Sequence, residues 1–214
     1  MNIRVEKLVP EPLSDLQNLN SEIWHAEKQE FLSGNNYLVY SASGKGKTSL
    51  LSFIYGLRTD YFGEIMIDNR NIKDLKYNDW LDMKRGKMSM VFQGLNLFNG
   101  LSVMENIQLK NKLTNHVSKE EITNMLDVLH VGELAKKKVE EISYGQKQRV
   151  AIVRALCQPF EIILLDEPFS HLDEENANIA MNLISKRVEH ENASLIITSL
   201  KMINFDCKLL SIRM

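Results

Sequence analysis

The segment YLVYSASGKGKTSLLSFIYGL, residues 37–57, decides the fold, because it places a strand pattern, a glycine-rich loop and a helix pattern in direct succession. Aromatic and β-branched residues at 37–40 predict a strand. Apolar residues spaced three and four apart at 48–57 predict a helix. This is the context that a phosphate-binding P-loop requires. Gly44 and Gly46 let the backbone curl closely around a phosphate, so that successive amides point at it from a helix N-terminus.

The side chains at the end of this loop suit a nucleotide bound with magnesium. Lys47 is expected to bridge the β- and γ-phosphates as a point charge, and the Thr48 hydroxyl is expected to ligate Mg²⁺. Ser41 departs from the motif, which begins with glycine, but it still offers a backbone amide. A glycine- and lysine-rich surface turn before a helix is the alternative for this segment alone. The predicted nucleotide-binding residues of the loop are Ser41, Ala42, Ser43, Gly44, Lys45, Gly46, Lys47, Thr48 and Ser49.

Strand and helix patterns alternate on both sides of the loop and predict an α/β core. Apolar runs at 162–165 and 194–198 are typical of strands buried on both faces of a parallel sheet. Other strands are expected at 3–9, 23–31, 64–67, 88–92 and 208–212, and helices at 48–57, 103–113, 119–130, 146–156 and 174–188. Residues 97–140 have no strand pattern, so an inserted helical subdomain is expected there, within one continuous domain at 1–214.

Composition and charge exclude several classes of protein. An apolar fraction of 44% in 214 residues is enough for a hydrophobic core. The formal charge of −2 gives no bulk attraction to nucleic acid, which is not expected as a partner. Cys157 and Cys207 are the only cysteines, and their wide separation favours inert core thiols in a reducing compartment. Neither a signal peptide nor a membrane-spanning stretch is visible, so a cytosolic protein is expected.

Two carboxylates, Asp166 and Glu167, follow the buried strand pattern at 162–165. Open α/β sheets bind their ligands at the carboxyl ends of such strands. Adjacent residues on a strand point in opposite directions, so the two acids are expected to act differently. Asp166 is the natural partner of Mg²⁺, and Glu167 is the natural group to polarise an attacking water. The alternative is that the pair only caps the following turn.

The segment ISYGQ at 142–146, which opens a predicted helix, resembles the LSGGQ signature of the ABC ATPase family. Gln93 in MVFQ resembles the family's Q-loop glutamine, SHLD at 170–173 resembles its D-loop, and Asp166 with Glu167 resembles its Walker B acids. The motifs occur in the family's order and span nearly the whole chain. The resemblance implies a P-loop NTPase of the ABC type, with a mixed β core, an N-terminal antiparallel β subdomain and an inserted α-helical subdomain.

The resemblance also implies how such a chain works. Ser143, Gly145 and Gln146 belong to the signature, which in the family contacts the γ-phosphate of ATP bound to the opposite subunit. The expected cofactors are ATP and Mg²⁺. One expected partner is a second ATPase subunit, and a homodimer is favoured over a heterodimer. The other is an integral membrane subunit of a transporter, which would hold this chain at the cytoplasmic face of the cell membrane. The predicted metal-site residues are Thr48, Gln93 and Asp166.

The sequence after Gln93 suggests contact with that membrane subunit. Apolar residues occupy a segment that should be loop: Leu95, Leu97, Phe98 and Leu101. Core packing is one explanation for them, and the resemblance favours another, a groove that receives a segment of the membrane subunit. The stretch VFQGLNLFNGLSVMENI is most similar to the lipoprotein-release, macrolide-export and cell-division branch of the family.

Ser199 follows the strand pattern at 194–198, at the position where the family has a histidine that contacts the γ-phosphate. Losing one positioned donor to transition-state charge lowers turnover on the order of 100- to 1000-fold. Slow hydrolysis is therefore expected, unless a different ATPase subunit compensates in a heterodimer. The predicted catalytic positions are Glu167, Gln93 and Ser199.

Two more positions depart from the family pattern. Tyr144 replaces a signature glycine, where its side chain would either crowd the phosphate or point away. No aromatic residue at 10–18 can stack on adenine, and the nearest candidate is Trp24, although core packing is the commoner role of a tryptophan in strand-like sequence. Two functions other than a transport motor stay open, an ATP-gated scaffold with little hydrolysis and a soluble ABC ATPase of cofactor assembly.

Overall fold

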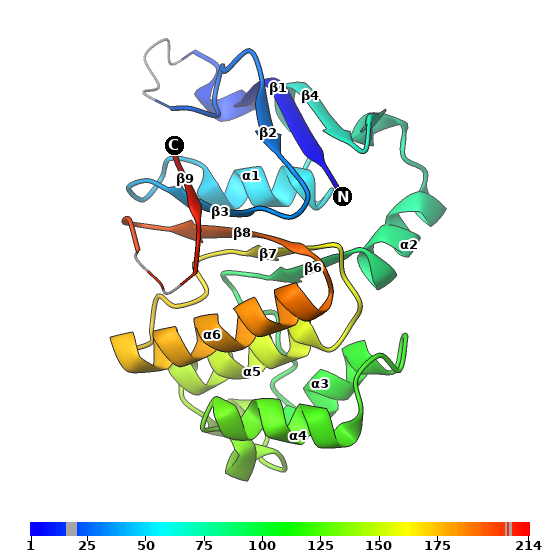
Figure 1. Ribbon diagram of the computed structural model, residues 1–214, viewed down its shortest axis with the longest axis vertical. Helices are drawn as coiled ribbons and strands as arrows, with labels where there is room; N and C mark the ends of the chain where they lie inside the picture. Colours follow the sequence, from blue (N-terminus) through cyan, green and yellow to red (C-terminus); the bar gives the residue numbers. More distant parts are fainter. Residues whose placement is uncertain (16–20, 204, 206) are drawn as a thin grey trace.

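Five parallel strands form the central sheet of this computed structural model, which describes residues 1–15, 21–203, 205 and 207–214. The strand order is β6-β7-β8-β3-β9, and every neighbouring pair in it runs parallel. The loops after β3, β6, β7 and β8 therefore leave the sheet at one edge (Figure 1). The strands are β3 (Asn36–Tyr40), β6 (Met88–Val91), β7 (Ile162–Leu165), β8 (Ser194–Ser199) and β9 (Leu210–Arg213).

Strand β7 shows why these segments are apolar throughout. Ile162 and Leu164 pack into the core on the side of α1 (Lys47–Ile54). Ile163 and Leu165 pack into the core on the opposite side, with the helices of the lower half of Figure 1. Because both faces are covered, the strand has no polar face, as expected for a parallel sheet between helices.

A second, antiparallel sheet covers the other side of α1, which lies between the two sheets in Figure 1. Its strand order is β2-β1-β4-β5. The predicted mixed β core is thus divided into an antiparallel N-terminal sheet and a parallel central one. The antiparallel strands are β1 (Ile3–Pro10), β2 (Gln29–Phe31), β4 (Tyr61–Ile67) and β5 (Arg70–Asn71).

The helices α5 and α6 pack beneath the parallel sheet, and α3 and α4 lie beyond them (Figure 1). Ser102, Ser118 and Ser143 each cap a helix, and the residue three positions later returns a hydrogen bond to the backbone of the cap. These local signals explain why the starts of α3 and α4 match the sequence expectation. The helices are α2 (Tyr77–Gly86), α3 (Val103–Asn111), α4 (Lys119–Val128), α5 (Tyr144–Leu156) and α6 (Glu174–His190).

The strand expected at 23–31 is wrong for most of its length, since only Gln29–Phe31 forms β2. The Ser21 hydroxyl accepts hydrogen bonds from the amides of Ile23 (3.1 Å) and Trp24 (2.9 Å). The next residue, His25, has a positive φ of 62°. The chain therefore turns here, because a side-chain cap satisfies the amides that a strand would have paired.

Helix α2 was not expected, because polar and charged residues dominate it and none of its residues is fully buried. Its start is fixed by Asp79, which accepts a hydrogen bond from the Lys76 amide at 2.8 Å. Cys157 is a buried core thiol whose pKa burial raises to about 12. Cys207 is only partly buried, and it packs against the edge of the same core.

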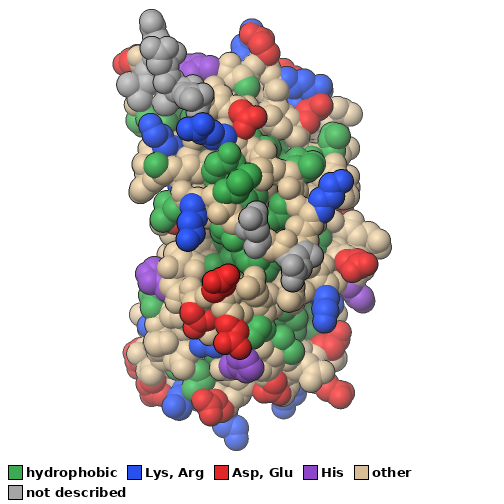
Figure 2. All heavy atoms as spheres, turned by 60° about the vertical axis from the view of Figure 1, so that its left-hand side comes forward, with side chains coloured by type: hydrophobic (Ala, Val, Ile, Leu, Met, Phe, Trp, Pro, Cys, Tyr) green, Lys and Arg blue, Asp and Glu red, His purple; other side chains and the backbone are tan. Residues whose placement is uncertain are grey.

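The face of the molecule shown in Figure 2 carries charges of both signs. In Figure 2, acidic and basic side chains are both scattered over the face, with hydrophobic side chains showing between them. None of the helices in the described ranges is long and apolar enough to span a membrane.

Candidate functional site

The P-loop occupies the turn between β3 and α1. Gly46 has a φ of 95° and lies so close to Trp24 that an added Cβ would come within 2.9 Å of the indole ring. Gly44 has a φ of 78°, and an added Cβ would meet nothing within 4 Å. Ser41 is not among the residues with positive φ, so the departure from glycine at this position places no strain on the backbone.

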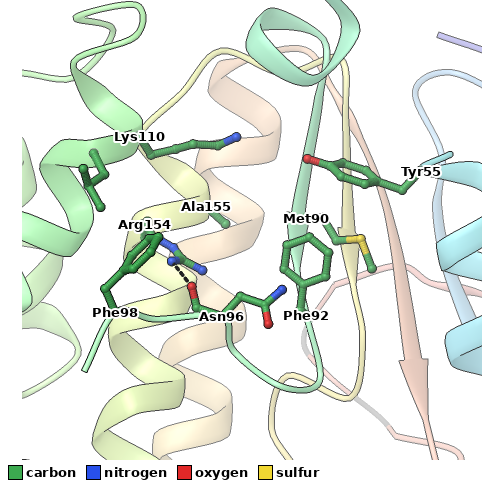
Figure 3. A pocket seen from close by; sticks show the side chains of 9 residues that line it. Tyr55, Met90, Phe92, Asn96, Phe98, Lys110, Arg154 and Ala155 are labelled. Atoms are coloured by element: carbon green, nitrogen blue, oxygen red, sulfur yellow. Dashed lines mark hydrogen bonds between the residues drawn. The ribbon is translucent and has the colours of Figure 1, made fainter. Parts of the chain in front are cut away.

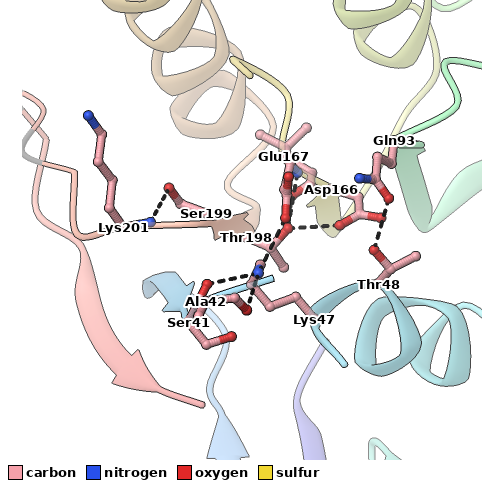
Figure 4. A network of polar contacts seen from close by, with 11 residues as sticks. Ser41, Ala42, Lys47, Thr48, Gln93, Asp166, Glu167, Thr198, Ser199 and Lys201 are labelled. Carbon is pink, nitrogen blue, oxygen red and sulfur yellow. Dashed lines mark hydrogen bonds and ion pairs between the residues drawn. The ribbon is translucent and has the colours of Figure 1, made fainter. Parts of the chain in front are cut away.

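The Lys47 ammonium lies buried beneath the loop. Its Nζ donates to the backbone carbonyls of Ser41 (2.9 Å) and Ala42 (3.2 Å), and it forms an ion pair with Glu167 Oε1 at 3.3 Å (Figure 4). Both partners are largely shielded from solvent, which strengthens the attraction between the two charges. The cation is thereby held between the start of the loop and the Glu167 carboxylate.

Backbone amides from Ser43 to Ser49 donate no hydrogen bond to any protein group in the described part of the chain. Unpaired donors at a helix start, together with a buried cation, form an arrangement that favours anions. The residues present therefore fit the polyphosphate of a nucleotide.

Trp24 packs against the P-loop and holds it in place. Its side chain is only 2% exposed, and its Nε1 donates to the Lys45 carbonyl at 2.8 Å. The ring also packs on Gly46. Trp24 is thus a core residue that holds the loop, and its buried ring cannot stack on adenine. Of the two roles considered for it, the structure supports core packing.

Replacing Trp24 with phenylalanine should lower the free energy of unfolding by about 1–3 kcal/mol, because the smaller ring leaves a gap at Gly46 and the Lys45 carbonyl loses its donor. Urea unfolding followed by circular dichroism measures this loss. Trp80→Phe is the matched control, since Trp80 is only partly buried and its indole makes no hydrogen bond among the described residues. An equal loss in both variants would contradict a special role for Trp24.

Asp166 and Glu167 lie where β7 ends, and Thr198 on β8 ties them together. The Thr198 hydroxyl donates to Asp166 Oδ1 at 2.9 Å and accepts from the Glu167 amide at 3.0 Å (Figure 4). Burial raises the pKa of the Asp166 carboxyl above its usual range, while the hydrogen bond from Thr198 opposes that rise. Glu167 has a positive φ of 47°, an unusual conformation for a residue other than glycine.

The sequence did not predict that Thr198 contacts the two acids, because only the pairing of β7 with β8 brings it next to them. The available signal was weak, a hydroxyl residue near the end of an otherwise apolar strand. We regard it as a positioning residue for the carboxylates.

Oxygen ligands for a divalent cation gather beside the loop. The Thr48 hydroxyl donates to Gln93 Oε1 at 3.3 Å, and the same hydroxyl opposes the rise that burial causes in the pKa of the Asp166 carboxyl. A hydroxyl, an amide oxygen and a carboxylate are the ligand types that Mg²⁺ prefers. The residues present therefore fit the ion predicted for this position.

These groups share one pocket of about 260 Å³. The structure thus brings together the loop, Gln93 and Glu167, while Asp166 lies outside the lining and is linked to Glu167 through Thr198. It does not bring the signature or Ser199 into the lining of this pocket. The lining residues are Ser43, Gly44, Gly46, Lys47, Thr48, Ser49, Gln93 and Glu167.

Ser199 lines a neighbouring pocket of about 330 Å³, which it shares with Glu167 and Thr198. Its hydroxyl accepts from the Lys201 amide at 3.3 Å, and the Lys201 side chain points away from the carboxylates in Figure 4. Two histidines nearby in sequence are held elsewhere, since His171 packs on Tyr144 and His190 contacts Glu191.

The signature forms the start of α5. Ser143 caps the helix, its hydroxyl accepting from the Gln146 amide at 3.3 Å while Gln146 Oε1 accepts from the Ser143 amide at 2.8 Å. The Tyr144 hydroxyl donates to the Gln93 carbonyl at 3.1 Å, so this side chain points toward the loop after β6. An added Cβ at Gly145 would come within 3.0 Å of the His171 carbonyl, which explains the glycine there.

The known proteins to which this chain is similar are ATP-binding proteins of transport systems. Residues 28–170 match the family model described as ABC transporter. The chain is 33% identical over 169 residues to the lipoprotein-releasing system ATP-binding protein LolD of Buchnera aphidicola (subspecies Schizaphis graminum), covering 78% of this chain and 74% of LolD. It is 33% identical over 186 residues to the macrolide export ATP-binding/permease protein MacB of Campylobacter jejuni, covering 86% of this chain and 28% of MacB.

A solved structure with the same arrangement is the dimeric, post-hydrolysis form of the ATP-binding cassette MJ0796 of Methanocaldococcus jannaschii, bound to ADP and Pi. It superposes with a TM-score of 0.74 at 26% sequence identity. The superposition covers 93% of this chain and 88% of that one.

Proposed function

The chain belongs to the family of ABC transporter ATP-binding proteins, and we propose that it is the motor of a transporter, dimerising around Mg-ATP and driving a separate membrane subunit. The ABC ATPase fold and the ATP-binding function predicted from the motifs are confirmed by the family match and by the MJ0796 structure. The relatives that act in lipoprotein release and macrolide export agree with the predicted branch.

One observation carries the proposal: a buried cation, unpaired amides and oxygen ligands converge on one pocket, while the signature lies outside its lining. Neither surface encloses a nucleotide by itself. A second copy would supply the signature, with Ser143 and Gly145 at the helix start directed at the γ-phosphate. The dimeric MJ0796 cassette with ADP and Pi supports this arrangement.

Each residue in and beside the pocket then has its own proposed role in ATP hydrolysis. Lys47 would neutralise phosphate charge, and Thr48, Gln93 and Asp166 would hold Mg²⁺, which supplies further stabilisation of negative charge. Glu167 would orient and polarise a water, and its backbone hydrogen bond to Thr198 keeps it in place. Ser43, Gly44 and Ser49 would contribute to the phosphate cradle.

The relatives support a proposal for the membrane partner and for the location. LolD belongs to a lipoprotein-releasing system and MacB is named as a combined ATP-binding and permease protein. We place this chain at the cytoplasmic face of the cell membrane, bound to an integral subunit, with residues 97–140 as the helical subdomain between the nucleotide and that subunit. A homodimer is the simpler arrangement and a heterodimer the alternative.

Turnover of the intact complex tests the proposal against an ATP-gated scaffold. We expect steady release of phosphate from ATP by the complex in detergent or vesicles, at about 0.6 to 6 turnovers per minute, which is 100- to 1000-fold below a typical enzyme turnover of about 10 per second. Binding of ATP without release of phosphate would favour the scaffold. A complex that contains no membrane protein would favour a soluble ATPase of cofactor assembly.

Introducing the missing histidine should raise turnover. Ser199→His places a donor in the pocket that Ser199 shares with Glu167, and one such donor contributes on the order of 100- to 1000-fold at most. Basal ATPase activity of the purified chain measures the effect. Ser199→Asn is the size control without an imidazole.

Two results would count against this idea of slow hydrolysis. The first is a rate in Ser199→His that is equal to or below that of the natural chain, although thermal unfolding shows an intact fold. The second is an equal rise in Ser199→Asn. Ser199 is buried, so the unfolding measurement is needed to separate misfolding from loss of chemistry.

A further inference from the structure

His171 lies against the signature, although it belongs to the segment between β7 and α6. Its ring packs on Tyr144, with 4.4 Å between the ring centres and an angle of 56° between the ring planes. An added Cβ at Gly145 would come within 3.0 Å of the His171 carbonyl, so the two backbones are also in direct contact. Wherever the signature is placed, His171 is therefore placed with it.

Gln148, a buried residue of α5, fixes this histidine from the other side. Its Oε1 accepts from the His171 amide at 3.1 Å, which leaves its Nε2 as the donor to Ser170 Oγ at 3.0 Å. Ser170 Oγ in turn lies 2.9 Å from His171 Nδ1. Because the serine oxygen already accepts from Gln148, its own hydrogen is free to donate to Nδ1. The neutral ring then carries its hydrogen on Nε2.

The Nε2 atom of His171 makes no hydrogen bond with any residue that the structure describes. A protonated imidazole also carries a hydrogen on this atom, so Nε2 is a donor in both charge states. The side chain is exposed. The contact with Ser170 thus orients the ring, while Nε2 stays available to donate to another group.

Tyr144 is itself held, so the ring that supports His171 has a fixed position. The tyrosine hydroxyl donates to the Gln93 carbonyl at 3.1 Å. The loop that contains this carbonyl is anchored further on by Arg154, which donates to the Asn96 carbonyl at 2.5 Å (Figure 3). Arg154 and Tyr144 both belong to α5. The helix therefore holds the loop at two points and keeps Tyr144 against His171.

His171 does not reach the nucleotide site of its own chain. It lines neither the pocket of the P-loop nor the pocket of Ser199, although its neighbours Ser170 and Leu172 line the second of these. Ser199 stands where the resemblance to the family implies a histidine. Within the described part of the chain, neither pocket has a histidine in its lining, while His171 faces the signature.

We propose that His171 acts across the dimer, donating a hydrogen bond from Nε2 to the γ-phosphate of the ATP bound to the other copy. The proposed dimer brings the signature of one copy to that phosphate, and His171 accompanies the signature. The same phosphate is the one that Ser199 of the other copy would face. This inference rests on the proposed function and adds a catalytic residue to it.

The role of His171 is electrostatic and requires no proton transfer from its ring. Water attacks the γ-phosphorus, the bond from that phosphorus to the bridging oxygen of ADP breaks, and Glu167 receives a proton of the water. The Nε2 hydrogen stabilises negative charge on the phosphoryl oxygens. A donor from a second chain is placed less precisely than one on an adjacent strand, so compensation is partial. Turnover stays slow, and the remaining rate depends on His171.

Replacing His171 with phenylalanine separates the donor from the packing. Phenylalanine keeps a ring against Tyr144 and removes Nε2, so turnover should fall about 10- to 100-fold while ATP still drives dimerisation. His171→Gln, whose amide can donate from a similar position, should recover part of the rate. Phosphate release measures turnover, and sedimentation with Mg-ATP measures dimerisation. His190→Phe makes the same change at an exposed position on α6 and should alter neither.

Mixed dimers test whether the histidine acts on the other copy. A small amount of the His171→Phe chain is combined with an excess of the Glu167→Gln chain. Each mixed dimer then has one site that combines Glu167 of the first chain with His171 of the second. We expect this site to recover the rate of a natural site.

The matched mixture combines a small amount of the natural chain with an excess of the double variant Glu167→Gln with His171→Phe. Its mixed dimers contain the same residues in total, but the intact Glu167 now faces the copy that lacks the histidine. Turnover should therefore stay about 10- to 100-fold below that of the first mixture.

Restoring the missing histidine should make His171 dispensable. In a Ser199→His chain, the further change His171→Phe should lower turnover less than about 3-fold, because the phosphate already has a donor from its own site. The loss caused by His171→Phe is thus expected to depend on the residue at position 199.

Several outcomes would overturn the inference. These are an unchanged rate in His171→Phe, equal rates in the two mixtures, a faster rate in the mixture with the double variant, or an equal loss from His171→Phe in the natural and the Ser199→His chains. Loss of ATP-driven dimerisation in His171→Phe would also overturn it, since His171 would then be only a packing residue. If the natural chain itself fails to dimerise with ATP, the proposed function fails instead.

Discussion

Glu167→Gln should lower ATP turnover by about 100- to 10,000-fold and leave an ATP-bound dimer that persists in solution. The carboxylate is the group expected to polarise water, and general-base catalysis contributes rate factors of this size. Glutamine has the same shape and still accepts a hydrogen bond from Lys47, which lies 3.3 Å from Glu167 Oε1. ATP binding should therefore survive, and without hydrolysis the nucleotide continues to stabilise the dimer. Phosphate release and sedimentation with and without Mg-ATP measure the two effects.

The control for this variant is Glu120→Gln, which makes the same chemical change at an exposed position on α4. We expect it to hydrolyse ATP as the natural chain does and to return to monomer as ATP is consumed. A Glu167→Gln chain that stays monomeric with Mg-ATP and its membrane partner would contradict the proposal that ATP joins two copies. Unchanged turnover would remove Glu167 from its proposed role.

Lys47→Ala should weaken ATP binding roughly 10- to 150-fold, because a hydrogen bond to a charged group contributes about 1.5–3 kcal/mol. The ammonium is buried at the mouth of the loop and is held by the Ser41 and Ala42 carbonyls, so its position is already fixed before binding. Calorimetric titration with a slowly hydrolysed ATP analogue and Mg²⁺ measures the dissociation constant.

Loss of the Lys47 side chain also leaves Glu167 without its cation, so the thermal midpoint of the variant must be measured alongside. Lys186→Ala removes an exposed lysine from α6 and serves as the matched control for overall charge. An unchanged dissociation constant in a folded Lys47→Ala chain would show that the loop does not hold phosphate as proposed.

Most of the core elements were predictable, because their signals lie in short stretches of sequence. The all-apolar runs that became β7 and β8 need both faces buried, whatever surrounds them. The serine caps of α3 and α4 fix the helix starts through bonds to residues three positions away. The strand predicted at 23–31 is wrong because the Ser21 hydroxyl caps the amides of Ile23 and Trp24, and because the Lys45 carbonyl, 21 residues later, holds the Trp24 indole. Helix α2 was not predicted, because most of its residues are polar or charged and none is fully buried.

The amino-acid sequence by itself determined the P-loop and the order of the motifs, since glycine at 44 and 46, a lysine and a hydroxyl must stand in consecutive positions to form the cradle. The tertiary structure alone decided that Thr198 joins Asp166 to Glu167 and that Trp24 supports the loop. The physical reason is distance along the chain. These contacts join residues more than twenty positions apart, and they form only after strand order and helix packing bring those residues together.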